Sequence, residues 1–256
     1  MSQQPLKNRH AVITGGGGGI GAAVAERLSA LGASVSLFGR DLARLERQHA
    51  RMPNAFAAVC DVTDDNAVSH AFAAAAERFG PVSILVNNAG AAPSAPFAKT
   101  SRETWDEVMA VNLTGAFLCS QAALPGMQAA GWGRIVNVAS TAGLKGYPYV
   151  SAYVAAKHGL VGLTRALALE VAKSGVTVNA VCPGFTDTDL VGRAVEAISA
   201  KTGREPEAAK AALAASNPQG RLVEPAEVAS AAAWLCLPES AAVNGAAIPV
   251  AGGEVG

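Results

Sequence analysis

Short apolar runs alternate with longer helical patterns along almost the whole chain, and this alternation limits the available folds more than any other feature. Seven runs are rich in β-branched residues and largely apolar on both faces; they lie at 11–14, 34–38, 56–60, 83–86, 134–138, 176–181 and 246–250. Helical patterns lie between them, at 22–31, 65–79, 101–130, 151–173 and 225–237. Strands of this composition are covered by helices on both sides, and repeated alternation requires right-handed crossovers and a parallel sheet. We therefore predict a single α/β domain over residues 1–256, built on a doubly wound parallel sheet of about seven strands with helices on both faces.

One long segment lacks a clear pattern, although no linker rich in Pro, Gly or Ser divides the chain. Residues 184–220 separate a strand from the last helix. A connection of this length in a compact domain is often a lid or a binding loop. We predict that 184–220 is an irregular, mobile flap over the substrate site.

The composition excludes several classes of protein. Half of the 256 residues are hydrophobic and 16% are charged, which is not the profile of a disordered chain. Twenty basic residues balance twenty acidic ones without a basic patch, which argues against nucleic acid or an anionic membrane as a partner. The N-terminus is polar and no apolar run approaches ~18 residues, so we expect no signal peptide, no membrane span and a cytoplasmic location.

The cysteines and histidines form no metal-binding pattern. The four cysteines are far apart and have apolar neighbours, so they are interpreted as small buried hydrophobes: Cys60, Cys119, Cys182 and Cys236. The histidines are not clustered and are interpreted as surface or helix residues: His10, His49, His70 and His158. We therefore predict no metal site.

A run of glycines follows the first predicted strand and opens the first predicted helix. Glycines allow a tight turn and let a pyrophosphate approach the backbone N–H groups at the positive end of a helix. Two dinucleotide spacings fit the run: one uses Gly16, Gly18 and Gly21, and the other uses Gly15, Gly19 and Gly21. A flexible linker is the alternative, but the strand before the run and the helix after it favour the dinucleotide site.

The acidic residue that normally contacts the adenosine ribose is absent. An acidic residue is expected about 20 positions after the glycines, at the end of the second strand. Gly39 stands there and Arg40 follows it. A guanidinium suits a 2′-phosphate better than a free 2′-hydroxyl, so NADP(H) is favoured and NAD(H) remains possible. Arg40 could also be an ordinary solvated loop charge.

Ser140, Tyr153 and Lys157 form the candidate catalytic group. Ser140 follows the strand at 134–138, at the sheet edge where parallel sheets bind ligands. Tyr153 and Lys157 are four residues apart on a predicted helix and therefore share a face. An ammonium near the phenol would lower its pKa from ~10, so that the tyrosine could exchange a proton with an alcohol or ketone. Taken alone, the pair could also be a surface tyrosine beside a solvated lysine.

Together these features resemble the classical short-chain dehydrogenase/reductases over about residues 9–253. Four matching segments imply cofactor contacts: Thr14, Gly15, Gly19, Ile20 and Gly21 after the first strand; Asp61 and Val62 at the adenine; Asn88, Ala89 and Gly90 after the fourth strand; and Pro183, Gly184, Thr186 and Thr188 at the nicotinamide. In the family Tyr153 and Lys157 would contact the cofactor as well. Thr186 departs from the family, which usually has a branched aliphatic residue there.

The resemblance also implies a catalytic tetrad. Ser140, Tyr153 and Lys157 have the family's spacing, and Asn112 matches the helix asparagine that supports a proton-relay water near the lysine. Because all four are present, a non-catalytic cofactor-binding scaffold is disfavoured.

The implied function is an NAD(P)(H)-dependent oxidoreductase that interconverts a secondary alcohol and a ketone of a small molecule. The resemblance is closest to reductases of 3-oxoacyl thioesters and dehydrogenases of 3-hydroxyacyl thioesters. Dehydrogenases of sugars, polyols, steroids or aromatic alcohols in the same family remain alternatives. The family further implies a homotetramer.

Overall fold

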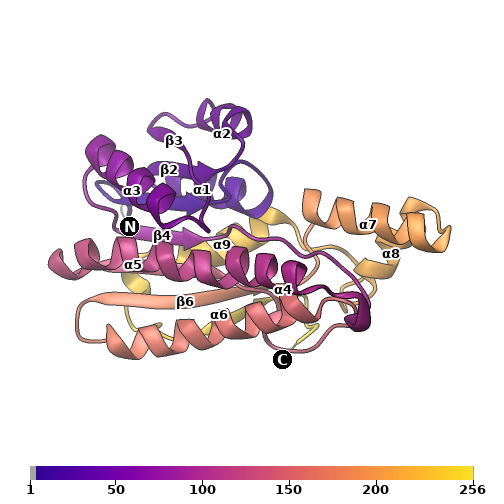
Figure 1. The fold of residues 1–256 in the computed structure, drawn as a ribbon. Helices are drawn as coiled ribbons and strands as arrows, with labels where there is room; N and C mark the ends of the chain where they lie inside the picture. Colours follow the sequence, from indigo (N-terminus) through magenta and orange to yellow (C-terminus); the bar gives the residue numbers. More distant parts are fainter. Residues whose placement is uncertain (1–3, 256) are drawn as a thin grey trace.

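The computed structural model describes residues 4–255, and its centre is one seven-stranded sheet in the order β3-β2-β1-β4-β5-β6-β7 (Figure 1). Every neighbouring pair of strands is parallel. The strands are β1 His10–Thr14, β2 Ser34–Gly39, β3 Ala55–Val59, β4 Ile84–Asn87, β5 Gly133–Val138, β6 Val176–Pro183 and β7 Ala247–Val250. The prediction of a doubly wound α/β domain is confirmed.

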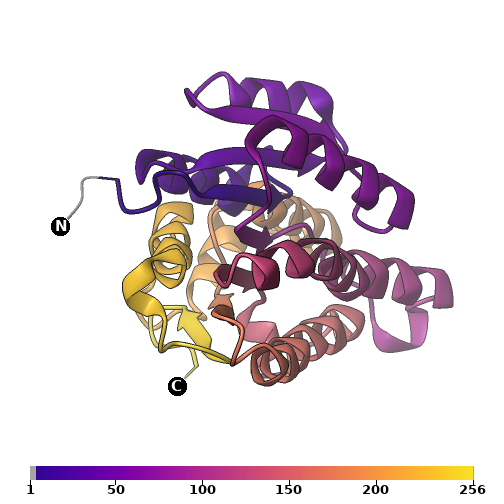
Figure 2. The same cartoon turned by 90° about the vertical axis from the view of Figure 1, so that its left-hand side faces the viewer.

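Helices cover both faces of the sheet (Figure 2). One layer contains α1 (Gly19–Ala30), α2 (Leu42–His49) and α9 (Pro225–Cys236), and the other contains α3 (Asp65–Phe79), α5 (Gly115–Ala129) and α6 (Ser151–Glu170). Strand β1 shows why both layers form. Ala11 and Ile13 belong to the core under α1 and α9, whereas Val12 belongs to the core under α3 and α5. A strand that is apolar on both faces needs a helix on each side.

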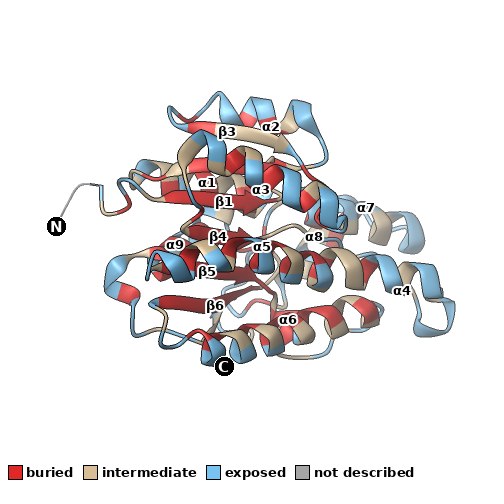
Figure 3. Cartoon of the chain, turned by 60° about the vertical axis from the view of Figure 1, so that its left-hand side comes forward, coloured by how far each residue is buried: buried red, intermediate tan, exposed pale blue. Residues whose placement is uncertain are grey.

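Burial follows this layering. The strands in the middle of the sheet are buried, while the outer surfaces of the helices are exposed (Figure 3). Several helices begin where local chemistry predicts. Asp64 accepts a hydrogen bond from Ala67 N and caps α3, and Pro225 is the first residue of α9. All four cysteines are free and buried, as predicted.

The flap prediction is wrong in its local structure. Residues 184–220 contain two helices, α7 (Asp189–Thr202) and α8 (Pro206–Ala214), which lie beyond the carboxyl ends of the strands (Figure 1). They enclose a small apolar cluster of their own: Val191, Val195, Ala209 and Leu222. The charged residues of this segment obscured its helical period, and the apolar positions become recognisable only as one packed cluster. Helix α2, too, was not among the predicted elements.

One histidine differs from its predicted environment. His10 lies in β1 and is buried, with ring nitrogens 2.8 Å from Gly80 O and 2.8 Å from Ser36 Oγ. Burial lowers the pKa of His10, which favours the neutral ring. The carbonyl and hydroxyl partners satisfy a polar side chain that the sequence pattern placed at the surface.

The helical stretch predicted at 101–130 is continuous from Arg102 to Ala129. It consists of α4 (Arg102–Met109), a π-helical turn (Ala110–Thr114) and α5. This helix is long and apolar enough to cross a membrane, with a mean hydropathy of 1.3 in its most apolar window. We did not expect such a helix from the sequence. Because α5 packs against α3, β4 and β5, this helix belongs to the core of the domain.

Candidate active site

The glycine-rich turn is closely packed and joins β1 to α1. Gly15 and Gly19 have φ of +63° and +53°, a region that disfavours other residues. At Gly21 a Cβ would lie 2.4 Å from Gly15 O, so no side chain fits where the turn meets the helix. Ile20 is half-buried and packs against the core under α1 and α9. The spacing that uses Gly15, Gly19 and Gly21 therefore describes the turn.

The first turn of α1 has the properties of an anion site. Gly18 caps the helix without a side-chain hydrogen bond, and the first turn contains no acidic residue. The free N–H groups and the positive helix end would suit a pyrophosphate. The dinucleotide cofactor implied by the sequence therefore fits this turn.

Thr14 ties the glycine turn to the segment after β4. Its Oγ1 accepts hydrogen bonds from Asn88 N at 2.9 Å and Ala89 N at 3.0 Å. The Asn88 side chain donates to Thr14 O at 3.0 Å and Gly15 O at 3.2 Å. This contact lies between β1 and β4, where the strand order changes direction, and doubly wound folds bind cofactors at that point.

Arg40 and Asp61 lie near each other at the ends of β2 and β3. Hydrogen bonds from the Thr63 backbone and hydroxyl lower the pKa of Asp61, and the Arg40 charge lowers it further. Gly39 has Leu45 as its neighbour, with 3.3 Å between a Cβ at Gly39 and Leu45 Cδ2. Val62 is buried beside Gly115 and does not present its side chain to solvent.

Arg44 is a cation at the glycine turn that the sequence reasoning missed. It lies in the first turn of α2, which Asp41 caps by accepting from Arg44 N. A Cβ at Gly18 would be 3.0 Å from Arg44 Nη2, so the guanidinium covers the turn. Arg44 also forms an ion pair with Asp189, the first residue of α7. Its closeness in sequence to Arg40, just after the end of β2, was the available signal.

Ser140 and Tyr153 contact each other at the carboxyl edge of the sheet. Ser140 follows β5, and its Oγ accepts a hydrogen bond from Ala142 N at 3.0 Å. The Ser140 hydroxyl also lies beside the phenol of Tyr153, on the first turn of α6. Burial raises the pKa of Tyr153, and the nearby Ser140 hydroxyl opposes that rise. The expectation that Lys157 lowers the pKa of Tyr153 is therefore wrong for this structure, because desolvation of the buried phenol dominates.

Lys157 lies one helical turn after Tyr153 and is buried. Its Nζ donates to Val138 O at 2.8 Å and lies 5.6 Å from the centre of the Tyr153 ring. Burial lowers the pKa of Lys157 to about 8. The ammonium is thus close to the phenol, as the shared helix face predicted.

Asn112 lies in the π-helical turn, and such turns are common at functional sites. Its Nδ2 donates to Ala91 O at 2.8 Å and Val108 O at 2.9 Å, while its buried Oδ1 has no partner among the described residues. A Cβ at Gly90 would be 2.7 Å from Oδ1 and 3.8 Å from Lys157 Nζ. The unused acceptor and the ammonium therefore face the same point, where one water could bridge them.

The segment after β6 connects the sheet edge to the flap. Pro183 ends β6, and Thr186 pairs with Val223 in an isolated bridge while donating to Gly184 O at 3.0 Å. Thr188 approaches the turn directly, because a Cβ at Gly19 would be 3.1 Å from Thr188 Cγ2. The structure thus brings this segment, the glycine turn and the catalytic residues to one edge of the sheet.

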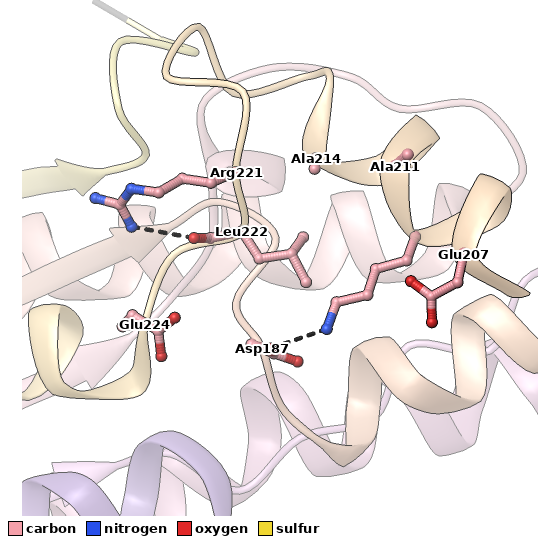
Figure 4. A pocket seen from close by; sticks show the side chains of 8 residues that line it. Asp187, Glu207, Ala211, Ala214, Arg221, Leu222 and Glu224 are labelled. Atoms are coloured by element: carbon pink, nitrogen blue, oxygen red, sulfur yellow. Dashed lines mark hydrogen bonds and ion pairs between the residues drawn. The ribbon is translucent and has the colours of Figure 1, made fainter.

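A separate cavity of about 300 Å³ lies within the flap (Figure 4). Asp187 and Lys210 form an ion pair of 3.0 Å at one side of it, and Arg221 bonds to Leu222 O at 3.1 Å at the other. None of the tetrad residues lines this cavity. It is distinct from the candidate active site. No cluster of metal-ligating side chains occurs within residues 4–255.

Comparisons with known proteins agree with this geometry. The family model for short chain dehydrogenases matches residues 9–199. The chain is 40% identical over 255 residues to D-beta-hydroxybutyrate dehydrogenase of Cupriavidus necator, covering 98% of this chain and 99% of that protein. It is 36% identical over 252 residues to the 3-oxoacyl-acyl-carrier-protein reductase MabA of Mycobacterium tuberculosis, covering 98% and 95%. A crystal structure of a variant of actinorhodin polyketide ketoreductase with NADPH has a TM-score of 0.94 and 38% identity, with 99% of each chain covered.

Proposed function

The chain belongs to the short-chain dehydrogenase family and is an NAD(P)-dependent oxidoreductase acting on CH–OH groups, and we propose that it reduces a 3-oxoacyl thioester to the 3-hydroxyacyl thioester with NADPH. The observation that carries the proposal is that Ser140 and Tyr153 lie next to each other at the same carboxyl edge of the sheet as the glycine-rich turn. The similarity to MabA and to a polyketide ketoreductase supports a 3-oxoacyl substrate. A free 3-hydroxy acid is the second candidate, supported by the similarity to a hydroxybutyrate dehydrogenase.

Ser140 and Tyr153 act on the carbonyl oxygen. A nicotinamide cofactor held at the glycine turn would supply the hydride for the carbonyl carbon. Ser140 Oγ accepts from Ala142 N and its hydroxyl still has one proton to donate, which would turn from Tyr153 to the substrate oxygen when a substrate binds. Tyr153 gives that oxygen a proton as negative charge develops on it, and its raised pKa keeps it in the acid form beforehand.

Lys157 and Asn112 support the proton transfer. The Lys157 ammonium stabilises the tyrosinate that remains after the proton has left. The unpartnered Oδ1 of Asn112 can accept from a water that also contacts Lys157, which would return a proton to the site. This assigns the four residues the roles implied by the family resemblance.

Two arginines favour NADPH over NADH. Gly39 leaves room and supplies no carboxylate to repel a 2′-phosphate, and Arg40 follows it. Arg44 adds a second cation on the glycine turn. Charge-assisted forks from guanidinium groups are among the stronger hydrogen bonds to phosphate. We propose that both arginines contact the 2′-phosphate.

We also propose that helices α7 and α8 form the substrate flap and that the protein is a cytoplasmic homotetramer. Thr188, at the start of α7, contacts the glycine turn, and the two helices lie beyond the carboxyl edge of the sheet. Exposed apolar side chains on α5 and α6, Phe117 and Leu169, support burial against other subunits.

A substrate screen tests the proposed function. The purified protein is incubated with NADPH or NADH and with 3-oxoacyl thioesters, free 3-oxo acids, diketones, sugars or aryl ketones, and cofactor oxidation is followed by absorbance. We expect the highest kcat/KM for a 3-oxoacyl thioester with NADPH. A clear preference for a free 3-oxo acid would replace the thioester with the second candidate, and a preference for sugars or aryl ketones would reject both.

A further inference from the structure

A second tyrosine and a buried carboxylate lie beside the catalytic residues. The Tyr147 hydroxyl donates to Glu254 Oε1 at 2.5 Å and is 2.6 Å from Thr141 Oγ1. Lys145 Nζ lies 3.1 Å from the same carboxylate oxygen. The Glu254 side chain is 1% exposed, although it stands two residues from the C-terminus. A carboxylate at this depth requires partners, and the tyrosine and the lysine are those partners.

Glu254 also lies close to Gly184, just after the end of β6. A Cβ at Gly184 would lie 2.9 Å from Glu254 Oε2, and this oxygen is buried without a hydrogen-bond partner among the described residues. A side chain at Gly184 would therefore displace the carboxylate from Tyr147. The end of β6 and the C-terminal tail therefore pack closely against each other here.

Tyr147 joins two segments that flank the catalytic residues. Thr141 directly follows Ser140, and the Tyr147 ring meets Phe185 edge to face, with 6.1 Å between ring centres and an angle of 84°. Burial and Glu254 raise the pKa of Tyr147, and its proton is directed at the carboxylate. Tyr147 is thus unsuited to proton donation and available as an aromatic surface.

We infer that Glu254 is a positioning residue that holds Tyr147 in place, and that Tyr147 and Phe185 form an apolar wall that selects the substituent on the substrate carbonyl carbon. This inference rests on the proposed ketone reduction. A fixed aromatic wall favours a long or cyclic apolar substituent over a short one, because only the larger group can bury apolar area against both rings.

The test compares two phenylalanine variants in the same loop. Tyr147→Phe keeps the ring and removes the tether, whereas Tyr149→Phe makes the same change at a side chain that is 65% exposed. KM and kcat are measured for NADPH, for a short and for a long-chain 3-oxoacyl thioester, together with Tm. We expect Tyr147→Phe to lower the long-to-short ratio of kcat/KM about tenfold, as for loss of a hydrogen bond to a charged group, while KM for NADPH stays within about twofold. Tyr149→Phe should leave all values unchanged.

A second pair of variants tests the carboxylate. Glu254→Ala should reproduce the loss of selectivity, and Glu254→Gln, which keeps an acceptor oxygen for Tyr147, should restore most of it. Phe185→Leu alters the other ring of the wall and should also lower the long-to-short ratio of kcat/KM. An equal loss for both substrates, or a lower Tm with unchanged selectivity, would overturn the inference. Failure of the proposed function would be distinguishable, since the wild-type protein would then reduce neither thioester. In that case the long-to-short ratio of kcat/KM would be measured on short- and long-chain members of the best ketone class in the screen.

Discussion

Arg44 and Asp189 form an ion pair that crosses the glycine-rich turn and connects α2 to the first residue of α7. The two side chains are 41% and 64% exposed, so solvent screens the pair and it is worth about 0–1 kcal/mol. A phosphate would compete well with Asp189 for the guanidinium, since hydrogen bonds to charged groups contribute about 1.5–3 kcal/mol. The ion pair therefore holds Arg44 over the turn but is weak enough for a phosphate to replace Asp189.

Asp189→Asn is expected to strengthen NADPH binding by about two- to fivefold, because Arg44 is then no longer shared. Arg44→Gln should weaken NADPH binding more than NADH binding. Dissociation constants from fluorescence titration check both. Asp106→Asn, in the exposed pair with Arg102, is the matched control and should change nothing. Equal weakening of both cofactors by Asp189→Asn would mean that the pair closes the site and that Arg44 is not a 2′-phosphate ligand.

Tyr153→Phe should abolish turnover while preserving the fold and cofactor binding. The substitution removes the phenolic hydroxyl and with it the exchangeable proton, and loss of a general acid costs on the order of 10²-fold or more. Single-turnover kinetics with the best ketone, NADPH titration and circular dichroism would be compared with the wild type. A variant that retained a large part of the wild-type kcat would exclude Tyr153 as the proton donor.

Lys157→Met should raise the free energy of unfolding at pH 7 while abolishing activity. The pKa of the buried lysine is about 8, below the ordinary value of 10.5, so between these pH values the unfolded chain binds more protons than the folded one. Stability therefore rises with pH through this window. At pH 7 the buried ammonium costs on the order of 3 kcal/mol, offset in part by its bond to Val138 O.

Denaturant unfolding at pH 7 and pH 10 measures this effect. The gain in stability should be largest at pH 7 and shrink as the pH rises, and a pH-independent difference would contradict the assignment. In the wild type, kcat/KM for ketone reduction should fall above about pH 8, because that parameter reports groups of the free enzyme and Lys157 then loses its charge.

The cofactor preference should depend on Gly39 and Arg40. An aspartate at position 39 would repel a 2′-phosphate and bond the ribose hydroxyls of NADH, and loss of Arg40 removes a charged donor. Gly39→Asp combined with Arg40→Ala should therefore swing the NADPH-to-NADH ratio of kcat/KM by at least about tenfold. Steady-state kinetics with each cofactor decides the point. If the wild type already favours NADH, Arg40 has no role in cofactor choice.

The protein should be a homotetramer in solution. Phe117 on α5 is 45% exposed and Leu169 on α6 is 82% exposed, so each leaves apolar area that a partner subunit can cover. Light scattering after size exclusion should give four times the 25.7 kDa chain mass. A monomer at every concentration would reject the assembly.

The sequence alone predicted the parallel sheet and the candidate catalytic group. Strands such as β5 and β6 were recognisable because apolar residues on both faces mark a doubly covered strand, and α6 places Tyr153 and Lys157 on one face by its period alone. The order of motifs along the chain then matched Ser140 and Asn112 to the same site. These are local or periodic properties that need no knowledge of distant contacts.

Only the tertiary structure decided the rest. Arg44 reaches the glycine turn because α2 packs beside it, and Glu254 reaches Tyr147 because the tail folds back over β6, over a separation of 107 residues. Desolvation in the assembled site raises the pKa of Tyr153, whereas the spacing to Lys157 at i+4 had predicted a lowered pKa. Charge partners and burial depend on which surfaces meet in space, and no spacing along the chain encodes that.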